Sequence, residues 1–189
     1  MARPAEPGRR ALLDAGTALL GDPAGPSLAG MSVNAVVATA GMSKGAFYQH
    51  WPDRTAYLVA LHRRFHDELQ TLVTAAIRDL DPGLPRLTAA LTAYLDGCLA
   101  APQARALLFQ ARHDNALTAE VAARNAAFAA MVEPDLTAIG WQPPDPAASL
   151  LIAMAVHIAA VENTIGAPRR DLRETAAAFL RHGPDVGER

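Results

Sequence analysis

The sequence of 189 residues contains a single cysteine, Cys98, and a single lysine, Lys44. One cysteine can form no disulfide within the chain and offers no cysteine-based metal site, which is typical of a protein in a reducing compartment. No basic-then-apolar signal peptide opens the chain, and its longest nearly continuous apolar run, residues 150–161, is too short to cross a bilayer. We therefore expect a cytoplasmic protein that does not enter a membrane.

The sequence also has no series of short β-branched segments separated by hairpin turns, as an all-β protein would have. Alanine is abundant, and leucine and valine make up most of the aliphatic residues. These features predict an all-α fold. A chain of 189 residues can bury a substantial core, and its length fits either one large domain or two small ones.

The formal net charge of −2 alone argues against a nucleic-acid partner, but the charge is unevenly distributed. Residues 1–66 hold seven Lys or Arg against four Asp or Glu, a net of +3. Residues 67–189 hold the remaining ten against fifteen, a net of −5. A small N-terminal head that faces a polyanion, joined to an acidic body, would have this distribution.

Apolar residues at helical spacing, interrupted by glycine and proline, predict the helices. They cover approximately residues 9–20, 33–40, 43–50, 53–80, 85–100, 102–113, 116–139 with an interruption at Pro134, 146–165 and 171–182. Residues 150–161 are apolar on every side except at His157, which predicts a helix buried all round. A chain of this size has little interior to hide its last two helices, so a partner subunit is the economical explanation.

Two short predicted helices are joined by a tight turn. Ser32 and Ser43 are good N-caps for the first and the second helix, and Gly41 suits the left-handed position that ends the first. Pro52 stops the second helix. Short helices bounded in this way form a helix-turn-helix pattern.

The second short helix has two different faces. Phe47 and Trp51, four residues apart, are predicted to point inward with Met42. The opposite side holds Lys44, Gly45, Tyr48 and Gln49. Lysine and tyrosine can reach phosphate oxygens, lysine and glutamine can bond base edges, and glycine allows close approach, so this face suits a nucleic-acid groove. An ordinary helix corner with its polar side in water has the same periodicity.

The stretch "SVNAVVATAGMSKGAFYQHWPDR", residues 32–54, resembles the helix-turn-helix of the TetR family of transcriptional regulators. That motif typically has a Ser/Thr cap and an apolar-Ala pair, followed by Ala-Gly-Val-Ser-Lys-Gly-x-aromatic/Leu-Tyr-x-His-Phe-x-x-Lys. Here Val37 replaces the usual Ala, Trp51 replaces Phe, and Arg54 replaces Lys. The Pro- and Gly-rich loop at 21–30 is longer than the usual connection.

The resemblance implies that residues 43–50 form the recognition helix and that Arg54 meets a phosphate at the start of the following helix. The residues that it places near DNA are Ser32, Ser43, Lys44, Gly45, Tyr48, Gln49, His50 and Arg54. Helix N-termini at these places suit anions through their free N–H groups.

The resemblance further implies about nine helices per chain, with a three-helix DNA-binding domain over residues 6–66 (motif 32–51) and a body over 67–189 for effector binding and dimerisation. Helices 146–165 and 171–182 would form a homodimer interface. The expected protein is a repressor that binds a pseudo-palindromic double-stranded DNA operator and is released by a small-molecule effector of unknown identity. No cofactor is expected.

Several side chains of the body could line an effector cavity with an apolar wall and polar anchors. They are Tyr94, Phe109, Arg112, His113, Phe128, Met131, Met154, His157, Glu162 and Asn163. Core packing explains the apolar members equally simply. His157 fits either the cavity or the dimer interface, because an ionisable group in so apolar a run needs a partner.

His62 and His66 lie at helical spacing i, i+4 and could bind a metal. Without an acidic partner at comparable spacing, we expect instead that they face solvent, and we expect no metal site. No Ser-His-Asp signature, phosphate-binding glycine loop or HExxH motif is present, so we expect no enzyme. The alternative function is a helical ligand-binding or interaction protein whose head does not read DNA.

Overall fold

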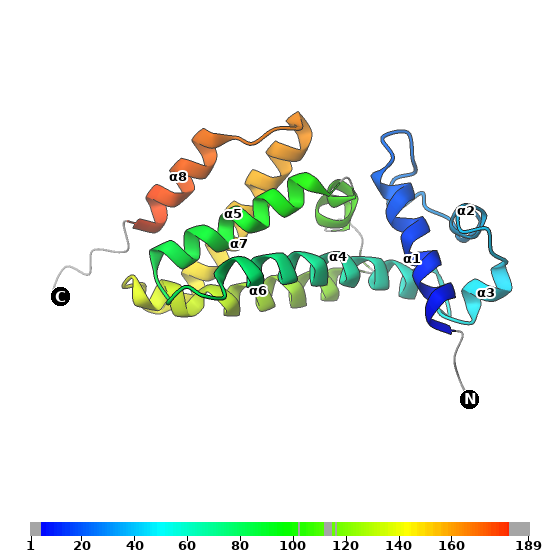
Figure 1. Cartoon of the computed structure of the whole chain (residues 1–189), viewed down its shortest axis with the longest axis horizontal. Helices are drawn as coiled ribbons and strands as arrows, with labels where there is room; N and C mark the ends of the chain where they lie inside the picture. The colour runs from blue at the N-terminus through cyan, green and yellow to red at the C-terminus, as the bar shows by residue number, and fades with distance from the viewer. Residues whose placement is uncertain (1–4, 102, 112–114, 116, 182–189) are drawn as a thin grey trace. The chain divides into compact units, whose positions relative to one another are not determined.

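The computed structural model describes residues 5–101, 103–111, 115 and 117–181. Over these residues the chain is helical and contains no strand, as predicted (Figure 1). The eight α-helices and one π-helix of this part are α1 (Ala5–Gly21), α2 (Val33–Thr39), α3 (Lys44–Tyr48), α4 (Arg54–Ile77), α5 (Leu84–Ala100), η1 (Arg105–Gln110), α6 (Thr118–Ala138), α7 (Pro144–Ile165) and α8 (Arg170–Arg181).

Two of the predicted helices differ from the structure in kind. The segment predicted as a helix over 102–113 contains the short π-helix η1, which spans only Arg105–Gln110. The predicted interruption at Pro134 is wrong, because α6 continues through this residue. Pro134 lies on the exposed side of α6, whereas its neighbours Asp135 and Leu136 are fully buried. Burial of these two neighbours stabilises the helix and offsets the loss of the backbone hydrogen bond that a proline cannot donate.

The chain divides into two compact units. Unit 1 contains Met1–His66 and Ala101–Val121, and unit 2 contains Asp67–Ala100 and Ala122–Arg189. Helix α4 contributes residues to both units. The division into a DNA-binding domain over 6–66 and a body over 67–189 stays a prediction, and segment Ala101–Val121 groups with unit 1.

In unit 1, α1 packs on α2 and α3, and α2 packs on α3. The first part of α4 fits closely against α1 at Gly16, where an added Cβ would overlap the Tyr57 hydroxyl. That hydroxyl donates a hydrogen bond of 2.7 Å to the Leu12 carbonyl, and both residues are buried. Burial raises the pKa of Tyr57 above its ordinary value, so the phenol stays protonated and keeps donating.

In unit 2, α5 packs on α7 and α8, and α7 packs on α8 (Figure 1). The prediction that α7 is buried all round is wrong for the single chain, because one of its faces is exposed, including Leu150 at 66%. By length and composition alone, α7 could cross a membrane. This is weak evidence, since core helices of soluble proteins meet the same criteria.

Candidate nucleic-acid interface

Helices α2 and α3 have the predicted N-caps, and the predicted glycine lies in the turn between them. The Ser32 hydroxyl accepts a hydrogen bond from the Ala35 amide at 3.1 Å, and the Ser43 hydroxyl accepts one from the Ala46 amide at 3.2 Å. Gly41 has a φ of +63°, the left-handed conformation that glycine adopts most easily. The two serines and this glycine therefore set the start of each helix and the turn that joins them.

The inner face of α3 is held by aromatic side chains. Phe47 is fully buried and Trp51 is 5% exposed. The Phe47 ring centroid lies 5.5 Å from that of Trp51 and 5.1 Å from that of Tyr57 in α4, and Trp51 and Tyr57 are 4.9 Å apart. This cluster confirms that Phe47 and Trp51 point inward, and it fixes the orientation of a helix of only five residues.

The outer face of α3 is open to solvent. Lys44, Gly45 and Gln49 are exposed, and Tyr48 keeps 53% of its surface exposed although it touches Phe47 edge to face. A Cβ added at Gly45 would meet only the Ser43 hydroxyl, at 3.6 Å. The surface therefore offers a cation, a phenol, an amide and a gap in which a backbone or a phosphate can approach closely.

The remaining residues that the resemblance places near DNA differ in their exposure. Ser32 and Ser43 are exposed, and His50 is half-buried with its ring centroid 5.5 Å from that of Trp51. The first turn of α1 passes close to His50, since a Cβ added at Gly8 would lie 3.3 Å from His50 Nε2. The DNA contacts of these side chains stay predictions.

Arg54 has intramolecular partners that the sequence did not reveal. Its Nε donates to the Met31 carbonyl at 2.6 Å, and its Nη2 donates to the carbonyls of Leu28 at 2.6 Å and Ala29 at 2.9 Å. These acceptors lie 23 to 26 residues away along the chain, so no local pattern could indicate them. The guanidinium is thus directed at the connection between α1 and α2.

A further cation, absent from the sequence-based set, lies beside the end of α3. The guanidinium carbon of Arg9 is 5.4 Å from the Trp51 ring centroid, which is cation–π distance, and Arg9 is exposed. This contact joins the first turns of α1 to Trp51, which follows α3, and helical periodicity cannot predict a contact between residues so far apart in the sequence. Arg9 therefore adds an exposed positive charge beside Trp51.

The expectation that His62 and His66 face solvent is wrong. Both are buried, at 1% and 5% exposure, and their ring centroids lie 4.3 Å apart on one face of α4. Helical spacing brought the two rings together, but the charged neighbours Arg63 and Arg64 suggested the wrong face. Among the described residues, no group of three or more His, Cys, Asp or Glu could hold a metal ion.

The candidate effector residues do not gather in one place. Tyr94 and Phe128 pack edge to face with ring centroids 5.6 Å apart, and both are buried. Phe109 and Met131 are half-buried, in η1 and α6. Arg112 and His113 lie outside the described residues.

Met154 and His157 instead line a groove of about 550 Å³ in unit 2. Its walls are apolar side chains of the end of α6, the loop that follows, α7 and α8, with His157 as an ionisable member. The lining residues are Leu136, Trp141, Ala147, Leu150, Ala153, Met154, His157, Ile158, Leu172, Thr175, Ala176, Phe179 and Leu180. Leu150 and Phe179 remain 66% and 62% exposed, so the groove belongs to an uncovered apolar face.

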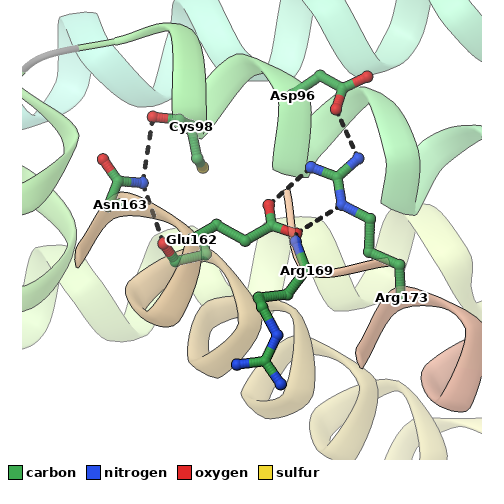
Figure 2. A network of polar contacts seen from close by, with 7 residues as sticks. Asp96, Cys98, Glu162, Asn163, Arg169 and Arg173 are labelled. Carbon is green, nitrogen blue, oxygen red and sulfur yellow. Dashed lines mark hydrogen bonds and ion pairs between the residues drawn. The ribbon is translucent and has the colours of Figure 1, made fainter. Parts of the chain in front are cut away.

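Glu162 and Asn163 belong to the polar network in Figure 2. The fully buried Glu162 carboxylate accepts from Arg173 Nε at 2.7 Å, from Arg173 Nη2 at 2.6 Å and from the Arg169 amide at 2.8 Å. Arg173 Nη1 also donates to Asp96 at 2.6 Å. The hydrogen bonds to Glu162 and Asp96 raise the pKa of Arg173, so the cation persists, and the network attaches α8 to α7 and α5.

Cys98 in α5 adjoins this network. Asn163 Nδ2 donates to the Cys98 carbonyl at 3.3 Å and to the Ala159 carbonyl at 3.0 Å. Burial raises the pKa of the Cys98 thiol to about 12, and the side chain is fully buried. The thiol therefore stays protonated near neutral pH and behaves as a small core residue rather than a nucleophile.

Comparisons with known proteins agree with the helix-turn-helix and with the all-helical fold. Residues 12–61 match the family of bacterial regulatory proteins described as "tetR family". A search of curated proteins finds no match. Among solved structures, the chain resembles a TetR-like transcriptional regulator from Rhodococcus sp. RHA1, with a TM-score of 0.73 and 17% identity over 95% of this chain and 94% of that one.

Two further structures have the same fold. One is a transcriptional regulator from Rhodococcus sp. Rha1, with a TM-score of 0.70 and 21% identity over 94% of each chain. The other is Escherichia coli NemR in its reduced form, with a TM-score of 0.71 and 18% identity over 95% of this chain and 100% of that one. The matched N-terminal segment and the all-helical fold lead to one conclusion: residues 12–61 carry the tetR-family segment of bacterial regulatory proteins, within a chain that has the fold of solved transcriptional regulators.

Proposed function

We propose that this protein is a homodimeric repressor that binds a pseudo-palindromic DNA operator and is released by a small-molecule effector. The observation that carries the proposal is the exposed face of α3, on which Lys44, Gly45, Tyr48 and Gln49 surround an open gap while the aromatic cluster holds the helix from behind. A rigid helix with an exposed cation, phenol and amide suits insertion into a major groove. Regulators of this family are typically DNA-binding proteins without enzymatic activity, and we propose a cytoplasmic location.

Dimerisation is proposed through the groove of α7 and α8. Its apolar lining and the exposed Leu150 and Phe179 form a surface that is costly to leave in water. A second copy would present the same surface, as a two-fold interface requires. The pair of recognition helices would then contact successive major grooves about 34 to 36 Å apart.

Effector release is proposed to act through α4, whose residues belong to both units. A ligand of unit 2 that favours an arrangement incompatible with the operator lowers operator affinity by its difference in binding free energy, and about 3 kcal/mol corresponds to about 150-fold. We propose that this ligand contacts Tyr94 and Phe128. Their buried rings pack edge to face, and an apolar molecule would enter between them by separating the two rings.

Substitution of the outer face of α3 tests the DNA-binding proposal. Lys44→Ala and Tyr48→Ala should each weaken binding to a duplex selected by the wild-type protein by about tenfold to hundredfold, equivalent to about 1–3 kcal/mol. If Lys44 contacts a phosphate, its loss also reduces the salt slope of the binding constant by about 0.9. Fluorescence anisotropy at several salt concentrations measures both quantities.

Arg78→Ala is the matched control, since Arg78 is an exposed cation in unit 2 and follows the end of α4. We expect it to bind as the wild type does. Equal binding by Lys44→Ala, Tyr48→Ala and the wild type would favour the alternative, a helical ligand-binding or interaction protein whose head does not read DNA.

A further inference from the structure

The connection between α1 and α2 is a closed turn built around Ser27. The amides of Gly30 and Met31 both donate to the Ser27 carbonyl at 3.0 Å, and the Gly30 amide also donates to the Ser27 hydroxyl at 3.1 Å. The side chains of Leu28 and Met31 are buried, at 1% and 2% exposure. This turn therefore has an inner side that is anchored in the core of unit 1.

The carbonyls of Leu28, Ala29 and Met31 converge on the guanidinium of Arg54, which donates to all three over 2.6 to 2.9 Å. A guanidinium holds its N–H groups in a rigid planar fork and can reach several acceptors at once. The ammonium of a lysine is a compact point charge on a flexible four-carbon stem and cannot reproduce this planar pattern. The arginine at this position therefore fits the turn specifically.

The same turn is held from a second direction by Gln110, the last residue of η1. Its Oε1 accepts a hydrogen bond of 2.5 Å from the Leu28 amide. Both backbone polar groups of Leu28 thus bind side chains from distant parts of unit 1, the amide to Gln110 and the carbonyl to Arg54. Two side chains together fix the position of one buried residue.

The turn leads directly into the helix-turn-helix. Met31, whose carbonyl accepts from Arg54, precedes Ser32, the N-cap of α2. A shift of the turn would move the start of α2 and, through the short connection at Gly41, the recognition helix α3. Sub-ångström placement of such side chains decides whether they meet phosphates and bases.

We propose that Arg54 and Gln110 are positioning residues for operator binding, which act by holding the turn at residues 27–31, and that Arg54 does not serve as a phosphate contact. This inference rests on the proposed DNA-binding function. It also reverses the role that the resemblance implies for residue 54. Through Gln110, η1 would thus contribute to DNA binding, although it lies far from the helix-turn-helix along the chain.

The test compares Arg54→Lys with Arg54→Ala, and Gln110→Glu with Gln110→Ala. Arg54→Lys keeps the positive charge but loses the fork, and Gln110→Glu keeps the acceptor oxygen that Gln110→Ala removes. Operator affinity is measured at several salt concentrations with a duplex selected by the wild type. We expect Arg54→Lys and Gln110→Ala to bind at least tenfold more weakly with the wild-type salt slope, and Gln110→Glu to bind within about threefold of the wild type.

Two results would overturn the inference. Binding by Arg54→Lys within about threefold of the wild type would mean that charge alone matters at this position. A salt slope lowered by about 0.9 in Arg54→Ala would identify a phosphate contact. Circular dichroism of each variant verifies that the protein is folded at the temperature of the assay.

Amide hydrogen exchange separates this inference from the function on which it rests. Arg54→Lys and Gln110→Ala should speed exchange of the Leu28 and Ala35 amides at least tenfold, with no comparable change in unit 2. Unchanged exchange at these amides refutes the positioning role, whether or not an operator is found. Failure of the wild type to select any DNA sequence, with the exchange result as expected, would refute the proposed function while the turn-holding role stands.

Discussion

Gly45 and Phe47 lie two residues apart in α3 and have opposite environments. Phe47 is fully buried in the aromatic cluster, and Gly45 is exposed. Helical periodicity predicted this difference, because two steps of about 100° place residues on nearly opposite sides of a helix. Periodicity could not predict the partners of Arg54 or the contact of Arg9 with Trp51, since both depend on how separate elements pack.

Glu162 and Arg173 form an ion pair, and the effect of its loss on stability should be measurable. Glu162→Gln removes the fully buried charge that faces the half-buried Arg173 guanidinium, and we expect a decrease of about 3 kcal/mol in the free energy of unfolding. Urea denaturation followed by circular dichroism measures this change.

The exposed pair of Arg169 and Asp171 provides the control for the ion-pair prediction. Its two groups are joined at 2.8 Å through Arg169 Nε, but water surrounds and screens them. Asp171→Asn should leave the unfolding free energy nearly unchanged. A Glu162→Gln protein as stable as Asp171→Asn would contradict the structural role given to the network in Figure 2.

Among the helices, the ends that the sequence could predict are those set by capping residues. Ser32, Ser43 and Gly41 are capping and turn residues whose effect depends on adjacent backbone groups, so α2 and α3 begin where predicted. The continuity of α6 through Pro134 depends on burial of neighbouring residues, which no local signal describes. The exposed face of α7 likewise depends on what covers the helix, so composition alone could not predict it.

Substitution of Gly45 should affect the stability of α3 and the proposed DNA binding in different ways. Alanine favours a helix over glycine by about 1 kcal/mol, and the structure leaves room for a Cβ at this position. Gly45→Ala should therefore raise the melting temperature or leave it unchanged, while it weakens operator binding at least tenfold because the methyl group occupies the gap next to DNA.

Gly16→Ala gives the opposite pattern and serves as the comparison for Gly45→Ala. Its methyl group would overlap the Tyr57 hydroxyl, so we expect a loss of about 1–3 kcal/mol of stability. Differential scanning calorimetry and anisotropy measure stability and binding in parallel. If Gly45→Ala bound the operator as tightly as the wild type, close approach of DNA at this position would be wrong.

For the whole molecule, the proposed dimer depends on the exposed apolar face of α7 and α8. Leu150→Asp and Phe179→Asp place a charge in the proposed interface, where burial of an unpaired carboxylate is costly. Each should convert the dimer to a monomer in sedimentation experiments and reduce operator affinity at least hundredfold, since one recognition helix then binds alone.

Leu80→Asp is the control for the interface variants. Leu80 is 40% exposed, follows α4 and does not line the groove. We expect this variant to remain dimeric. A dimer that persists in both Leu150→Asp and Phe179→Asp would show that the two copies meet elsewhere.

Selection of bound sequences from a random library of DNA duplexes by the wild-type protein tests the proposed operator binding. We expect enrichment of an inverted repeat whose half-site centres are separated by about one helical turn of DNA, or a multiple of it, because two α3 helices would read it from a two-fold dimer. Loss of that enrichment in Lys44→Ala would locate the reading surface on α3. A wild-type selection that enriches no sequence, or only an asymmetric one, would contradict operator reading by a two-fold dimer.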